Sequence, residues 1–146
     1  MKVDPNKFAR FSLLAAAIGF FGFGIVLFIA PGLMETAGVK IIDPAGSIEI
    51  RAFYGGVEMG LGMFFFIALR KKWILPGLSV QVLSNGFIVI TRVIALAIEG
   101  FQAKPATWWS LAAELFILLL GIMAIRIFKS NKTHSNEGSF EHLHGE

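Results

Sequence analysis

Apolar residues run along the chain in four long stretches that are separated by short polar segments. These stretches lie at about residues 11–30, 48–69, 76–98 and 108–128. A helix needs about 20 apolar residues to cross about 30 Å of hydrocarbon, and each stretch is that long. None has a polar face wide enough for an amphipathic helix of a soluble protein. The pattern predicts an all-α, four-helix transmembrane bundle whose helices run antiparallel, up and down.

The composition agrees with lipid as the solvent. Of the 146 residues, 55% are hydrophobic and only 16% are charged, against about 25% charged in ordinary soluble domains. The chain has no cysteine, which excludes disulfides, thiol catalysis and thiolate metal sites. The net charge of +3 does not indicate nucleic-acid binding, because the basic residues lie at the ends of apolar stretches and form no basic face.

Lysine and arginine are distributed unevenly between the two sides of the predicted bundle. Nine of them precede the first stretch, join the second to the third, or follow the fourth, whereas the other two connections carry only Lys40 and Lys104. By the positive-inside rule, both termini lie in the cytoplasm. We expect a transmembrane domain over residues 1–129 and a polar, disordered cytoplasmic tail over residues 130–146. The three histidines lie in this tail, so neither a metal site nor a cofactor is predicted.

Four ionisable residues from three of the apolar stretches gather in the outer half of the predicted bundle. Arg51 and Glu58 share one face of the second stretch, with Tyr54 at its border, while Arg92 lies in the third stretch and Glu114 in the fourth. At a rise of about 1.5 Å per residue, all four ionisable groups fall in the outer half of the membrane. A lone charge near a helix centre costs about 2.5–3.5 kcal/mol on the insertion scale. We therefore expect these arginines and acids to converge and to pair.

The third stretch also carries a secondary polar stripe. Gln81 and Asn85 continue it into the inner half, and Glu99 ends it at the outer edge. Polar stripes in lipid face the interior of the bundle or a water-filled cavity. The connection over residues 31–47 is longer than a tight turn needs. It lies either in the headgroup region or as a lid over a site beneath it.

Glycine is dense in the first two stretches. Gly24 of the first, and Gly55, Gly60 and Gly62 of the second, lie among several others. Small residues let membrane helices approach closely, so the first two helices should pack tightly. We then expect the three phenylalanines at residues 64–66 to face lipid or a partner subunit.

The order of these residues points to a family. An arginine leads into a glycine-rich helix, a second arginine precedes an acidic-Gly pair, and a glutamate follows: Arg51, Gly55, Gly56, Gly60, Gly62, Arg92, Glu99, Gly100 and Glu114. The chain resembles, over about residues 10–128, an uncharacterised family of small four-helix bacterial integral membrane proteins, a domain of unknown function. The resemblance implies an inner-membrane location and no assigned activity, and therefore no catalytic residue. Glu58 is not part of the resemblance.

Three functions remain open for the charged residues. The sequence favours a non-enzymatic protein that binds a small or lipid-like ligand in a charged pocket, where Arg51 and Arg92 hold an anionic end and Glu58 and Glu114 orient them. In the second, the charges only lock the helices of an accessory subunit in a membrane complex, or of a homo-oligomer. The third is a membrane enzyme on a lipid-soluble substrate, with either glutamate as general acid–base.

Overall fold

The computed structural model describes residues 4–141, and their side chains up to residue 130. In chain order its elements are α1 (Pro5–Ile29), the 3₁₀ helix η1 (Pro31–Ala37), α2 (Pro44–Glu49), the π-helix η2 (Ile50–Gly56), α3 (Val57–Arg70), α4 (Ile74–Ile98) and α5 (Pro105–Glu141). No strand occurs within residues 4–141. Four spans are long and apolar enough to cross a membrane: Pro5–Ile29, Pro44–Arg70, Ile74–Ile98 and Pro105–Ser130. The predicted all-α, four-helix transmembrane fold is confirmed.

All four spans begin earlier than the apolar pattern predicts, and in the first two an Asp-Pro pair starts the helix. Asp4 precedes Pro5, and its side chain accepts hydrogen bonds from the first backbone N–H groups of α1. Asp43 precedes Pro44 and accepts one from the backbone N of Gly46 at 3.0 Å. Proline suits the first position of a helix, where an N–H would have no partner, and aspartate is a preferred cap.

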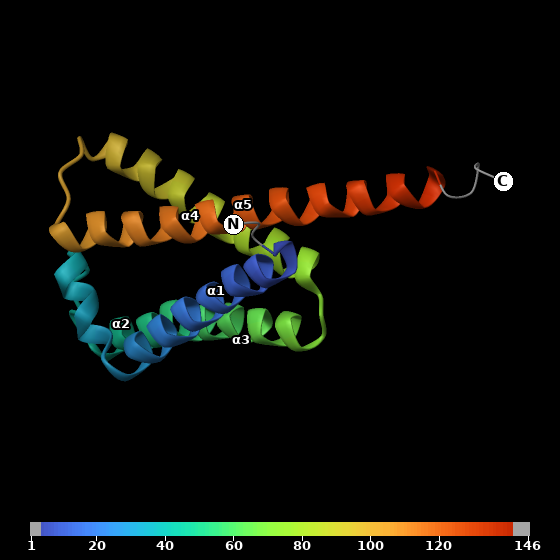
Figure 1. The fold of residues 1–146 in the computed structure, drawn as a ribbon. Helices are drawn as coiled ribbons and strands as arrows, with labels where there is room; N and C mark the ends of the chain where they lie inside the picture. The colour runs from blue at the N-terminus through green and yellow to red at the C-terminus, as the bar shows by residue number, and fades with distance from the viewer. Residues whose placement is uncertain (1–3, 142–146) are drawn as a thin grey trace.

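Consecutive spans run in alternating directions, so that α1 lies beside α3 and α4 lies beside α5 (Figure 1). The two pairs come together at the end that carries the N-terminus and the α3–α4 turn, which we call the basic end. They diverge toward the opposite end, where η1 lies between them (Figure 1); we call this the η1 end. The bundle is therefore closed at one end and spread at the other.

The buried core explains this shape. Its residues lie in the first half of α1, the second half of α3, the first turns of α4 and the second half of α5: Ala9, Leu13, Ala16, Ala17, Phe20, Phe65, Leu69, Ile74, Leu78 and Ala124. All of these positions are near the basic end. Phe65 is fully buried and meets Phe20 edge to face, with ring centroids 5.6 Å apart. The expectation that residues 64–66 all face lipid is therefore wrong for Phe65, which lies on the α3 face that α1 contacts.

Glycine brings α1 and α3 into backbone contact. A Cβ added to Gly24 would lie 2.7 Å from the carbonyl O of Gly55, and one added to Gly62 would lie 2.5 Å from the backbone N of Phe21. Only glycine fits at such distances, so the tight packing predicted for the first two spans is confirmed at these positions. A Cβ added to Gly60 would instead meet no packed atom within 4 Å, so Gly60 takes no part in this contact.

The last helix is longer than the predicted span. The apolar pattern ends near residue 128, whereas α5 continues to Glu141. Residues 130–141 are thus helical where the composition predicts disorder, since extending a formed helix costs far less than nucleating one. The remaining part of the predicted tail, which includes His142 and His144, lies outside the described residues.

Candidate functional site

A cavity of about 1130 Å³ lies at the η1 end, where the two helix pairs diverge. Side chains from all four spans line it, and residues 33–34 and 36–39 of η1 and its continuation cover it. Its walls are mainly apolar and include Phe23, Leu27, Ile88, Leu96 and Trp109. Its ionisable side chains are Tyr54, Glu58, Arg92, Glu99, Lys104 and Glu114. A mostly apolar hollow with a few converging polar groups is the usual form of a small-molecule site.

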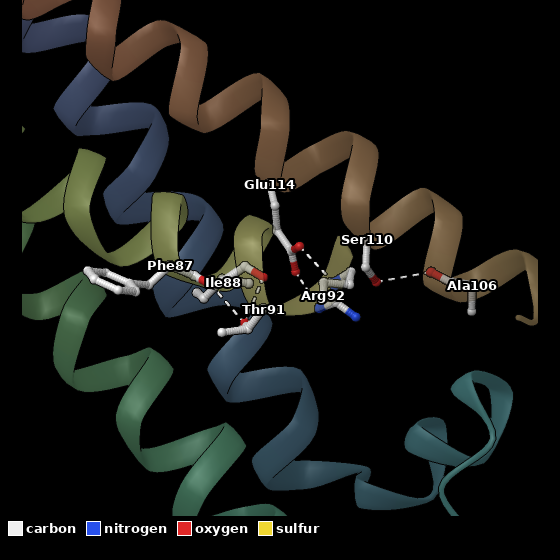
Figure 2. A network of polar contacts seen from close by, with 7 residues as sticks. All are labelled: Phe87, Ile88, Thr91, Arg92, Ala106, Ser110 and Glu114. Atoms are coloured by element: carbon white, nitrogen blue, oxygen red, sulfur yellow. Dashed lines mark hydrogen bonds and ion pairs between the residues drawn. The ribbon is translucent and has the colours of Figure 1, made fainter. Parts of the chain in front are cut away.

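Arg92 and Glu114 form a two-pronged ion pair in the wall of this cavity. Nε of Arg92 donates to Oε2 of Glu114 at 2.8 Å, and Nη2 donates to Oε1 at 2.6 Å. Figure 2 shows the two side chains pointing toward each other from α4 and α5. They are 31% and 18% exposed, respectively. The pair therefore joins two spans and also faces the cavity.

Two carboxylates and one guanidinium N–H group in the cavity have no protein partner. The Nη1 group of Arg92, whose guanidinium is paired with Glu114, makes no hydrogen bond or ion pair with any residue from 4 to 130. Within the same range, the carboxylates of Glu58 and Glu99 make none either. The sequence predicts a pairing of Arg92 with both Glu114 and Glu58. The structure shows only the pair with Glu114, while Glu58 lies half-buried in the wall of the same cavity.

Arg51 is not part of this site, contrary to the prediction. Its Nε donates to the carbonyl O of Phe28 at 2.9 Å, and its Nη1 donates to Oγ of Ser47. Phe28 is in the last turn of α1, where carbonyl groups have no partner within the helix. Arg51 therefore caps α1 and places a positive charge at the negative end of that helix.

The π-helix η2 explains why spacing placed Arg51 wrongly. The prediction that Arg51 and Glu58 share a face assumes 3.6 residues per turn throughout. Residues 50–56 instead form a π-helix, which is wider, with i→i+5 hydrogen bonds. The direction of Arg51 is therefore rotated away from that of Glu58. No pattern of apolar residues distinguishes a π-helix from an α-helix over seven positions.

The secondary polar stripe divides into two parts. Gln81 is fully buried, and its Nε2 donates to Oγ of Ser12 and to the carbonyl O of Ile117, both at 3.0 Å. Asn85 is 2% exposed and donates from Nδ2 to the carbonyl O of Gln81 at 2.9 Å. These bonds join α1, α4 and α5 below the cavity. Glu99 is exposed and lies in the cavity wall, so only this end of the stripe reaches the site.

Tyr54 and Glu58 also line a second, smaller hollow. It has a volume of about 660 Å³ and lies along α2, η2 and the first turn of α3. Val39, Tyr54 and Glu58 belong to the walls of both hollows. Tyr54 is 47% exposed. The sequence singled out Tyr54 and Glu58 by their polarity, but it gave no sign of the second hollow, whose other walls are mostly ordinary apolar residues.

The sequence did not decide whether the connection over residues 31–47 covers a site. The length of residues 31–47 was the only signal for a lid, and it allowed a loop in the headgroups equally well. The structure places Leu33 and Met34 in the cavity wall. It also shows Lys104 donating from Nζ to the carbonyl O of Glu35 at 2.9 Å, which ties η1 to the start of α5.

Comparison with protein families gives one match. A family model described as "Domain of unknown function (DUF4345)" covers residues 8–125, which is most of the chain. The chain belongs to the DUF4345 family. The matched range contains every residue that lines the cavity and all of η1. Membership of DUF4345 brings no assigned activity, in agreement with the expected uncharacterised family. Neither a curated protein nor a solved structure matches the chain.

Proposed function

We propose that this multi-pass DUF4345 protein lies in the bacterial inner membrane with both termini in the cytoplasm, and that it binds an amphipathic small molecule in the cavity at the η1 end. The observation that carries the proposal is the set of charged groups in that cavity. Arg92, Glu114 and Glu58 come from three different spans, and they face one hollow with apolar walls.

The unpaired groups favour binding over a purely structural lock. Charges that only fix the helices against one another need no cavity beside them. A carboxylate without a partner adds no stability to such a set of charges. Ionisable groups within the membrane are costly, and they occur where a substrate, an ion or a partner charge meets them. Glu58 and the Nη1 group of Arg92 lack such a partner among residues 4–130, so a ligand that supplies one is stabilised there.

Each residue then has a distinct role. Arg92 holds the anionic part of the ligand through Nη1, while Glu114 fixes the plane of its guanidinium through two hydrogen bonds. Glu58 accepts from a cationic or hydroxyl group, and Tyr54 offers a phenolic O–H at the edge of the cavity. Arg51 acts on the scaffold by capping α1 and does not touch the ligand.

Mass spectrometry of molecules that co-purify with the intact protein tests this proposal. A ligand retained by the wild type should be reduced about tenfold or more in Glu58→Gln, because a hydrogen bond to a charged group is lost. Glu35→Gln is the matched control, since this glutamate is exposed and its side chain lies outside the cavity. An equal yield from both variants, or no co-purifying molecule at all, contradicts the proposal.

A second candidate function is that of an accessory subunit in a membrane complex. A Cβ added to Gly19 or Gly22 of α1, or to Gly60 of α3, would meet no packed atom within 4 Å, so these glycines leave smooth surface toward the lipid. Small residues of this kind mark contacts between membrane helices. Because the chain has no cysteine, the variant Gly60→Cys carries a single thiol. Crosslinking of that thiol to one discrete partner in native membranes supports this function, and the absence of any crosslinked species argues against it.

A further inference from the structure

The second hollow shares wall residues with the cavity and lies along the exposed face of the second span. We call it the side groove, and it is lined by Val39, Lys40, Gly46, Glu49, Ile50, Phe53, Tyr54, Val57 and Glu58. Phe53 is 66% exposed and Val57 is 54% exposed, and both belong to a span long and apolar enough to cross a membrane. Acyl chains are the solvent around such a surface. The lining also contains the charged side chains of Lys40 and Glu49, but it is mainly apolar, so hydrocarbon can lie along Phe53 and Val57.

The side groove and the cavity meet at Tyr54 and Glu58. These two residues, with Val39, line both hollows. They lie four residues apart, one turn from each other along the same span. A molecule in the side groove therefore lies within one side chain of the cavity, and its route passes the carboxylate of Glu58.

The groups of the cavity that lack a partner fit a zwitterionic headgroup. Among residues 4–130, Glu58 presents a carboxylate with no partner, as does Glu99 at the outer end, and Arg92 presents Nη1 beyond its pair with Glu114. Arg92 and Glu58 form no ion pair with each other. A ligand with an ammonium at one point and a phosphate at another can satisfy both groups at once, and arginine is well suited to phosphate.

The chemistry of Glu58 selects the kind of ammonium. A carboxylate gains most from a cation that donates hydrogen bonds to it. A primary ammonium has three N–H donors, whereas a trimethylammonium has none. The same site therefore discriminates between two headgroups that carry the same net charge.

We propose that the ligand is a zwitterionic phospholipid with a primary ammonium, of the phosphatidylethanolamine type, whose headgroup lies in the cavity and whose acyl chain leaves through the side groove. The phosphate lies at Arg92, the ammonium lies at Glu58, and the chain passes Tyr54 toward Phe53 and Val57. This inference rests on the proposed function, and it adds the class of ligand and its route from the membrane.

Photo-crosslinking in bilayer nanodiscs tests the inference on the full-length protein. Three lipids carry the same photoactivatable group in one acyl chain and differ only in their ethanolamine, choline or glycerol headgroup. We expect the ethanolamine lipid to label peptides containing Phe53 and Val57 about tenfold more than the other two lipids do, which corresponds to one lost charged hydrogen bond. In Glu58→Gln this preference should disappear.

Two tryptophan variants separate the side groove from the general lipid surface. Val57→Trp fills the side groove, so it should abolish the preferential labelling. Met63→Trp is the control, because Met63 is 46% exposed on α3 and lines neither hollow. It should leave the labelling unchanged. A loss of labelling in both variants, or in neither, overturns the proposed route.

The remaining outcomes distinguish this inference from the function on which it rests. Equal labelling by all three lipids shows only the lipid that surrounds any membrane protein, and it overturns the inference. Soluble phosphoethanolamine that binds in an Arg92-dependent way, without preferential lipid labelling, also overturns it while the proposed function stands. If neither the lipid nor the soluble headgroup binds, and nothing co-purifies with the protein, both proposals fail.

Discussion

Lys104, just before α5, donates a hydrogen bond from Nζ to the carbonyl O of Glu35 in η1 at 2.9 Å. The Cε and Cδ atoms of its side chain lie 3.9 and 4.0 Å from the position that a Cβ on Gly38 would take, and Gly38 has a φ of 100°. One flexible side chain thus connects the segment that covers the cavity to the opposite pair of helices. Because Glu35 supplies a backbone carbonyl, this connection depends on Lys104 alone and not on the identity of residue 35.

Replacing Lys104 with methionine should loosen η1 without unfolding the bundle. The Gly38 and Val39 amides donate to carbonyl groups inside η1, so their hydrogen exchange should become about tenfold faster if the segment opens more often. The free energy of global unfolding should change by less than about 1 kcal/mol, as for one exposed hydrogen bond. Lys40→Met is the control and should leave the exchange unchanged. Unaltered exchange in Lys104→Met refutes the connection.

The ion pair between Arg92 and Glu114 should show strong coupling. Arg92→Met leaves Glu114 charged and unpaired within the membrane, so we expect a loss of roughly 1–3 kcal/mol in unfolding free energy, below the value for a fully buried pair. The double variant Arg92→Met with Glu114→Met removes both charges and should recover most of that loss. Reversible unfolding in mixed micelles measures the two single variants, Arg92→Met and Glu114→Met, and the double variant. Additive losses in the double variant indicate that the two side chains do not interact.

Gly60 and Gly62, which lie two residues apart in α3, should behave in opposite ways when they are replaced. Gly62→Ala forces a Cβ against the backbone of Phe21, so it should destabilise the protein by about 2 kcal/mol through overpacking. Gly60→Ala meets nothing within 4 Å and should stabilise the helix by about 0.5 kcal/mol. The same unfolding measurement compares them. A similar loss in both variants means that α1 and α3 do not pack as described.

The turn after α3 carries a strained lysine. Lys72 has a φ of 59°, and the backbone N of Trp73 donates to the carbonyl O of Ala68 at 2.8 Å. Glycine is the usual residue at this position of a helix C-terminus. A residue with a side chain loses about 1–2 kcal/mol of stability in the left-handed region. Lys72→Gly should therefore raise the unfolding free energy by about 1 kcal/mol.

Lys71→Gly is the control for this prediction. It removes the same charge from the same turn, but residue 71 has a φ of −81°, where glycine has no advantage. It should be neutral or destabilising in the same unfolding assay. An equal gain in both variants assigns the effect to charge and not to backbone conformation.

The sequence by itself determined the number of spans, the fold class and the identity of the polar residues that reach the site. Length and hydropathy decide these properties because every residue in a bilayer is either compatible with hydrocarbon or costly there. Arg92 and Glu114 could be paired from sequence alone, since their depths follow from the rise of a regular α-helix. The two Asp-Pro pairs also carry a local signal, because helix caps depend on neighbouring residues only.

Only the tertiary structure decided which charges meet. Arg51 was expected beside Glu58, but the π-helix over Ile50–Gly56 turns it toward the end of α1. Phe65 was expected in lipid, but it is buried against Phe20. The cavity itself exists because the core fills one end of the bundle while the helices diverge at the other. Such properties depend on how several helices rotate and pack together. The hydropathy of each single helix does not determine that packing.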